Sequence, residues 1–191
     1  MSKRVFLVHG WDGNPNNCWF PWLKKELEKR DFEVIIPKMP NPSEPEIDSW
    51  VSKLKEVVGK TDEDTYLIGH SIGCQTIMRY LEKLDDKNKV NGIIFVAGFF
   101  NLPYLETEEE KVIAEPWLET PINTEKVKKA VNNIVAIFSD DDPDVPFSDS
   151  NLFKSRLNAK IIMEHKKGHF SDDAGVKELP VALKELLRIS K

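Results

Sequence analysis

The sequence predicts a three-layer α/β/α fold, in which helices cover both faces of a mostly or wholly parallel sheet of about six strands. Short runs of β-branched and aromatic residues alternate with helical patterns along the 191 residues. Those runs are continuously apolar, as expected for strands whose two faces are both covered. With 40% apolar residues the chain can bury one substantial core, so we expect a single domain over residues 1–191.

Six runs are predicted as strands because each is short, apolar and bounded by turn-forming residues. They cover residues 5–8, 32–36, 65–68, 92–97, 134–138 and 160–163. Helical patterns cover residues 20–30, 46–58, 72–84, 148–157 and 179–189. In the third helix, Cys74, Ile77, Met78 and Leu81 form an apolar stripe that should face the sheet.

Two segments depart from this alternation. Residues 37–45 contain four prolines and are predicted to form a stiff surface loop. Residues 99–123 mix aromatic with acidic residues and are longer than an ordinary connection. We expect the second segment to be a long loop or a small insertion near the active site.

Composition excludes several classes of function. The net charge of -5, with basic and acidic residues intermixed, leaves no basic face for nucleic acid or an anionic membrane. Two cysteines make no disulfide framework, and no Cys/His cluster has the spacing of a zinc site. The first apolar run is too short for a signal peptide or a membrane span. We therefore expect a cytoplasmic protein without a metal or other cofactor.

The stretch TYLIGHSIGCQTI, residues 65–77, places a serine between a predicted strand and a predicted helix. Glycines two residues before and after the serine allow strand and helix to pass close to a strained turn that exposes the hydroxyl. Gly69, Ser71 and Gly73 meet this requirement, and Ser71 is the candidate nucleophile. The alternative is an ordinary strand-to-helix turn with an incidental serine.

The loop after the first strand, within VFLVHGWDG, is the candidate for the second half of an oxyanion hole. Acyl transfer needs two backbone N–H donors, one from the residue after the nucleophile and one from this loop. Ile72 and Trp11 occupy those positions. The alternative is an ordinary β–α loop in which His9 is a structural histidine.

A serine nucleophile also needs an orienting acid and a histidine base. The acid is expected at the end of the fifth strand, in FSDDDPDVP, where Asp142 is preferred because Pro143 favours an extended backbone. The neighbouring Asp140, Asp141 and Asp144 could instead solvate the loop, or the whole run could be a weak cation site.

The base is predicted in KGHFSDD, where His169 follows Gly168 in a loop beyond the last strand. His165 lies at the strand end and is less suitable. His70, next to Ser71, is expected to pack or hydrogen bond at its strand end, because consecutive side chains point apart. The predicted order Ser71, Asp142, His169 is that of the α/β-hydrolases.

Five motifs together, FLVHGWDG, WFPWLKKELEKRDFEVIIPKMPNP, LIGHSIG, FSDDDPDVP and KGHF, resemble the small serine hydrolase family that includes retinoblastoma-binding protein 9 and its bacterial relatives. The resemblance covers nearly the whole chain. It implies a compact α/β-hydrolase fold that lacks an initial antiparallel hairpin. It also implies the catalytic residues Ser71, Asp142 and His169, but it supplies no natural substrate and no protein partner.

From these residues we expect an acyl-enzyme mechanism and a small-molecule substrate, most simply a small or short-chain carboxylic ester. Trp11, Phe99 and Trp117 are candidates for lining the substrate pocket, although large aromatic residues are more often in the core. An amidase, peptidase or thioesterase would use the same three catalytic residues. A different alternative is a non-catalytic module that binds a partner through residues 99–123.

Overall fold

The computed structural model describes residues 2–85 and 87–191. In these residues six strands form one sheet in the order β2-β1-β3-β4-β5-β6, and every neighbouring pair is parallel. The predicted parallel α/β sheet is confirmed, with small shifts at the strand ends. The strands are β1 (Lys3–Val8), β2 (Phe32–Ile35), β3 (Thr65–His70), β4 (Val90–Val96), β5 (Val131–Ser139) and β6 (Lys160–Glu164).

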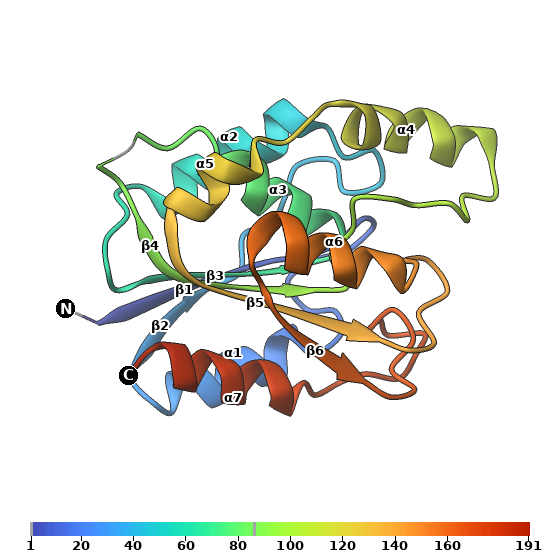
Figure 1. Ribbon diagram of the computed structural model, residues 1–191. Helices are drawn as coiled ribbons and strands as arrows, with labels where there is room; N and C mark the ends of the chain where they lie inside the picture. Colours follow the sequence, from blue (N-terminus) through green and yellow to red (C-terminus); the bar gives the residue numbers. More distant parts are fainter. Residues whose placement is uncertain (1, 86) are drawn as a thin grey trace.

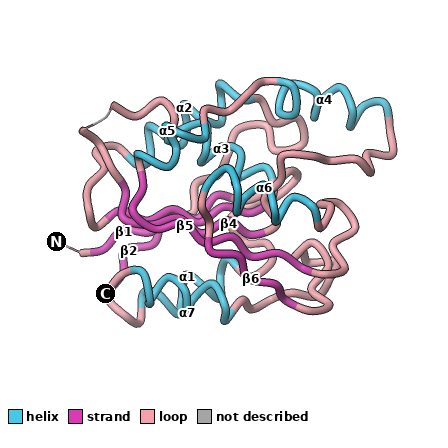
Figure 2. The backbone as a smooth tube through the Cα atoms, in the orientation of Figure 1, coloured by secondary structure: helices cyan, strands magenta, loops and turns pink. Residues whose placement is uncertain are grey.

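Helices cover both faces of this sheet (Figures 1 and 2). One face carries α1 (Phe20–Glu28) and α7 (Pro180–Ile189). The other helices lie on the opposite side: α2 (Ile47–Val58), α3 (Ile72–Leu81), α4 (Glu108–Glu119), α5 (Thr124–Lys129) and α6 (Ser148–Leu157). None of the helices in the described part of the chain is long and apolar enough to cross a membrane.

The two-sided burial explains the unbroken apolar runs in the sequence. In β3, Leu67 packs into the core on the side of α3, whereas Tyr66 and Ile68 pack into the core on the side of α1 and α7. All three side chains are fully buried. Successive side chains of a strand point to opposite faces, so both sets must be apolar when both faces are covered.

The segment 99–123, predicted as a long loop or a small insertion, contains the helix α4. Thr107 and Glu110 form a reciprocal capping box at the start of this helix. Only Ala114 and Trp117 of α4 are buried, and Pro116 lies inside the helix. With so few apolar positions the helical period is weak in the sequence. At the other end, the buried Arg79 of α3 donates to the carbonyl oxygens of Trp117 and Thr120, each at 2.8 Å.

The topology places a crevice at the carboxyl ends of β1 and β3. From β1 the chain goes first to β2 on one side and later to β3 on the other, so the strand order reverses between them. Ligands of open α/β sheets bind outside the carboxyl ends of strands at this point. The start of α3 approaches β1 closely, since a Cβ atom on Gly73 would lie 2.7 Å from the His9 carbonyl oxygen. Only glycine fits there.

Candidate active site

Ser71 occupies a sharp turn between β3 and α3. Its backbone lies at φ 53° and ψ -122°, a conformation that L-residues rarely adopt and that costs of order 1–3 kcal/mol. The turn is held on both sides: the Ser71 N–H donates to the Val96 carbonyl of β4 at 3.0 Å, and the Cys74 N–H donates to the Ser71 carbonyl at 2.9 Å. This is the strained strand–turn–helix context expected of a nucleophile elbow.

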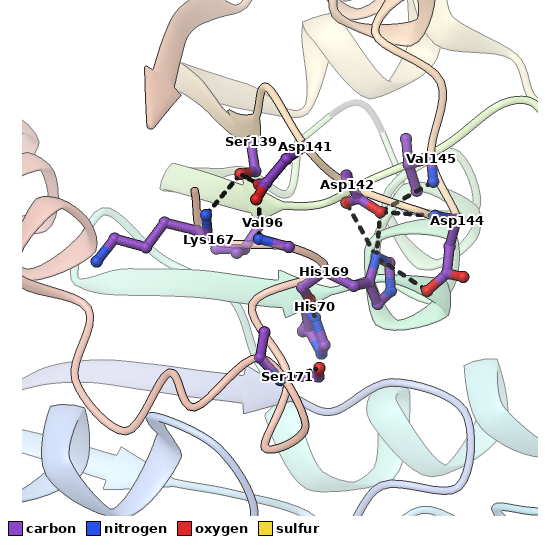
Figure 3. Close-up of polar contacts among 12 residues, drawn as sticks. His70, Val96, Ser139, Asp141, Asp142, Asp144, Val145, Lys167, His169 and Ser171 are labelled. Carbon is purple, nitrogen blue, oxygen red and sulfur yellow. Dashed lines mark hydrogen bonds and ion pairs between the residues drawn. The ribbon is translucent and has the colours of Figure 1, made fainter. Parts of the chain in front are cut away.

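The loop after β5 and the loop after β6 bring Asp142 and His169 together (Figure 3). His169 Nδ1 lies 3.0 Å from each carboxylate oxygen of Asp142, whose side chain is only 3% exposed. The N–H groups of Asp144 and Val145 donate to Asp142 Oδ1 at 2.9 and 3.0 Å and fix the carboxylate. An ionised carboxylate only accepts hydrogen bonds, so Nδ1 of His169 carries the proton and Nε2 is free to accept one.

The other acids after β5 have different partners. Asp141 accepts from the Gly168 N–H at 2.8 Å and from Ser139 Oγ at 2.6 Å. Asp140 accepts from the Lys166 N–H at 3.0 Å and contacts His165 Nδ1 at 2.6 Å. The Ser139 hydroxyl lowers the pKa of Asp141, and the His165 contact lowers that of Asp140. Both carboxylates therefore hold the loop that carries the histidine.

Asp142, Asp144 and His169 are also the one group of potential metal ligands found in residues 2–85 and 87–191, with ligand atoms within 4.8 Å of one another. Asp144 Oδ2 is 3.6 Å from the same Nδ1 that Asp142 holds. A cation at this point would compete for the nitrogen that donates to Asp142. The positions of Asp142 and His169 are thus explained by the hydrogen bond that orients the imidazole ring.

The loop after β1 presents the second candidate oxyanion donor. The Met39 N–H donates to His9 Nε2 at 3.2 Å, so His9 Nδ1 carries the proton and donates to the Gly10 carbonyl at 2.9 Å. That carbonyl also accepts the Gly13 N–H at 3.1 Å. The Gly10–Trp11 peptide is planar and trans, so fixing its carbonyl turns the Trp11 N–H to the opposite side. Within the described residues this N–H has no acceptor.

The proline-rich loop of residues 37–45 holds the loop after β1 through two hydrogen bonds. Trp11 Nε1 donates to the Ser43 carbonyl at 2.8 Å, and the Asp12 N–H donates to the Pro42 carbonyl at 2.8 Å. Ile72, the other predicted donor, is the first residue of α3, where an N–H has no acceptor within its helix. Both predicted donors are thus available, although their role in binding an oxyanion stays a prediction.

A cavity of about 840 Å³ joins these parts, since Ser71, His169 and Trp11 all line it. Phe99 and Trp117 do not line it, contrary to the prediction: each is 1% exposed and packs into the core. The apolar lining comes mainly from Leu102, Tyr104, Leu105 and Ile113, which sequence reasoning missed. Their segment was singled out for its aromatic and acidic residues, but no periodicity separates its cavity-facing residues from its core residues.

Comparison with known proteins agrees with this geometry. The model of the serine hydrolase family matches residues 5–188 of the chain. The chain belongs to the serine hydrolase family. YdeN of Bacillus subtilis (strain 168) is 35% identical over 182 residues, which are 95% of this chain and 93% of YdeN. Serine hydrolase RBBP9 of Rattus norvegicus is 28% identical over 155 residues, or 81% of this chain and 78% of RBBP9.

Solved structures show the same fold for this serine hydrolase. The crystal structure of the B. subtilis ydeN gene product superposes with a TM-score of 0.91 at 32% identity and covers 98% of both chains. Est1E from Butyrivibrio proteoclasticus superposes with a TM-score of 0.75 at 17% identity and covers 99% of this chain and 88% of Est1E. The expected resemblance to the small serine hydrolases is confirmed.

His70 forms a hydrogen bond at the end of β3, as the sequence predicted. Its Nε2–H donates to the backbone carbonyl of His169 at 2.7 Å, so it ties the nucleophile turn to the loop of the candidate base. Burial, followed by the proximity of His169, lowers the pKa of His70 to about 3. His70 is therefore neutral at the pH of any ordinary assay.

Replacing His70 with asparagine is expected to weaken the pH dependence of stability. A histidine that is hard to protonate when folded but ordinary when unfolded stabilises the fold above its unfolded pKa of 6.5, and this contribution is lost as the pH falls toward about 3. Between about pH 7 and about pH 5 the wild type should lose about 2 kcal/mol more free energy of unfolding than His70→Asn. Urea titrations at both pH values measure this difference, and equal losses would contradict it.

Proposed function

We propose that this serine hydrolase is a carboxylesterase that cleaves small or short-chain esters through an acyl-enzyme. The observation that carries the proposal is the hydrogen-bonded pair of Asp142 and His169, which opens on the same cavity as Ser71 in its strained turn. A histidine whose Nδ1 proton is held by a buried carboxylate presents the nitrogen that can accept the serine proton.

The reaction follows from these positions. His169 Nε2 takes the Ser71 hydroxyl proton while Oγ attacks the ester carbonyl, and the N–H groups of Trp11 and Ile72 stabilise the developing oxyanion. The protonated His169 then gives its proton to the leaving alkoxide, which departs as the alcohol. A water molecule, deprotonated by His169, attacks the acyl-enzyme, and His169 returns that proton to Ser71 Oγ as the carboxylic acid leaves.

The preference for short acyl groups rests on the size and lining of the cavity. A cavity of about 840 Å³ accommodates small molecules. Its apolar residues Leu102, Leu105 and Ile113 are interspersed with acidic residues. A long alkyl chain gains free energy only where it contacts continuous apolar surface. Esters are favoured over amides because an alkoxide is a better leaving group than an amide anion.

A series of p-nitrophenyl esters from acetate to palmitate, with an anilide and a thioester of the best acyl group, tests the proposal. We expect the highest kcat/KM at short chains and slower turnover of the matched anilide. An optimum at long chains would overturn the short-chain assignment, and a faster anilide or thioester would reassign the enzyme to that class. No turnover on the whole panel would favour a non-catalytic binding module.

A further inference from the structure

The charged residues that line the catalytic cavity are predominantly acidic. Seven aspartate or glutamate residues line it, and no lysine or arginine of the described residues does. The acidic residues come from four separate segments around the opening, namely the loops after β1, β5 and β6 and the start of α4 with the residues before it: Asp12, Glu106, Glu109, Glu110, Asp144, Asp172 and Asp173. The charge is therefore a property of the whole cavity and not of one acidic loop.

Two of these carboxylates are held in the ionised form. Lys177 pairs with Asp172, and this contact lowers the pKa of the carboxylate. The N–H groups of Thr107 and Glu106 donate to Glu110 at 2.9 and 2.7 Å and lower its pKa. Lys177 is the one lysine or arginine of the described chain that is ion-paired with a lining carboxylate. The remaining negative charge faces the cavity and solvent.

Aromatic rings supply a second, independent feature of the same cavity. Trp11, whose backbone N–H is a predicted oxyanion donor, lines the cavity. Tyr104 also lines it, and 62% of the Tyr104 surface is exposed. An exposed aromatic ring in a cavity has a free face, and such faces attract ammonium groups. Acidic residues combined with aromatic rings are the surroundings that a cationic ligand prefers, whereas an anionic ligand is repelled.

We propose that the preferred substrates of this enzyme are esters that carry a positive charge, such as an ammonium group on the acyl or alcohol part. The proposal rests on the ester hydrolysis proposed above and names the substrate class of that same site. The catalytic cavity defines where the ester binds; its carboxylates and aromatic rings decide which charge is accepted. Anionic acyl groups should be poor substrates for the same reason.

Two isosteric pairs of esters isolate charge from shape. The first compares p-nitrophenyl γ-trimethylammoniobutyrate with the neutral ester in which carbon replaces the nitrogen; the p-nitrophenyl half-ester of glutarate adds the anionic case. The second compares butyrylcholine with the butyrate of the matching neutral alcohol. At low ionic strength kcat/KM should be about tenfold higher for the cation in at least one pair, and added salt should reduce the ratio because it screens exposed charges.

A matched pair of variants assigns the preference to the cavity. Glu106→Gln/Glu109→Gln removes two charges from the lining, and the ratio of cationic to neutral kcat/KM should fall about threefold or more. Glu115→Gln/Glu119→Gln removes two charges from α4 at positions outside the lining, and the ratio should change by less than about 1.5-fold. Both variants have the same net charge, so only the position of the charges differs.

The outcomes separate this proposal from the proposed function. Neutral esters that are turned over as fast as or faster than the cations in both pairs would overturn the charge preference and leave the esterase intact. A preference that both double variants reduce equally would reflect net charge and would also overturn the assignment to the cavity. Absence of turnover on every ester, with no labelling of Ser71 by a fluorophosphonate, would overturn the function and this inference together.

Discussion

Replacing Ser71 with alanine is expected to lower kcat/KM for the best ester by at least about 10⁴-fold, because no other hydroxyl occupies the strained turn. The same variant should not react with a fluorophosphonate, which forms a covalent bond with an activated serine. Both readouts depend on the hydroxyl itself, whereas the fold depends on the backbone contacts of the turn with Val96 and Cys74. Thermal unfolding should therefore change little.

Two further variants make this result interpretable. Ser155 is exposed on α6 and its hydroxyl donates to the Leu152 carbonyl at 3.4 Å, so Ser155→Ala should retain activity and labelling. Ser71→Gly should be as inactive as Ser71→Ala and yet more stable. Glycine relieves strain of about 1–3 kcal/mol at this positive φ. It also destabilises the folded state by about 0.5–1 kcal/mol, because the unfolded chain gains conformational entropy. Undiminished labelling of Ser71→Ala would refute the assignment of the nucleophile.

Replacing Asp142 with asparagine should lower kcat by about 10⁴-fold with little change in stability. The Asp144 and Val145 N–H groups donate to Oδ1, so the asparagine carbonyl oxygen will keep that position and its NH₂ group will face His169. Nδ1 lies 3.0 Å from both oxygen positions, and an NH₂ group can only donate, so the change disfavours a proton on Nδ1 and shifts it toward Nε2. A protonated Nε2 cannot take the proton of Ser71.

The matched control is Asp144→Asn. Asp144 Oδ2 lies 3.6 Å from His169 Nδ1 and its side chain is 55% exposed, so the change should lower kcat by less than about tenfold. Steady-state kinetics on one neutral ester, together with urea unfolding of each variant, provide the comparison. Equal losses for the two variants would contradict the assignment of Asp142 as the orienting acid.

The layer architecture was predictable because burial on both faces leaves a strong pattern in each strand. Tyr66, Leu67 and Ile68 are apolar in sequence because they contact helices on alternate sides of β3. The helix α4 left no comparable pattern, since it buries only two side chains and contains Pro116. It is fixed instead by distant contacts, such as the hydrogen bonds from Arg79 to the end of the helix.

The part of the candidate site that could be predicted is the part where the chemistry requires a particular residue type at a particular place in the chain. Three local features mark the site: a serine between two glycines after a strand, an aspartate before a proline and a histidine after a glycine. Their order along the chain can also be read from the sequence. Phe99 and Trp117 show the limit of this reasoning. An aromatic residue can serve a core or a pocket, and the sequence of residues 99–123 does not distinguish the two.

The sequence by itself determined the parallel sheet, and it predicted the turn that holds Ser71 and the candidates Asp142 and His169, because each depends on local pattern or on residue chemistry. The tertiary structure alone decided which acid contacts His169, how the proline-rich loop supports Trp11 and which residues line the cavity. These last features join segments that are far apart in the chain. Their geometry arises from packing, which no local pattern records.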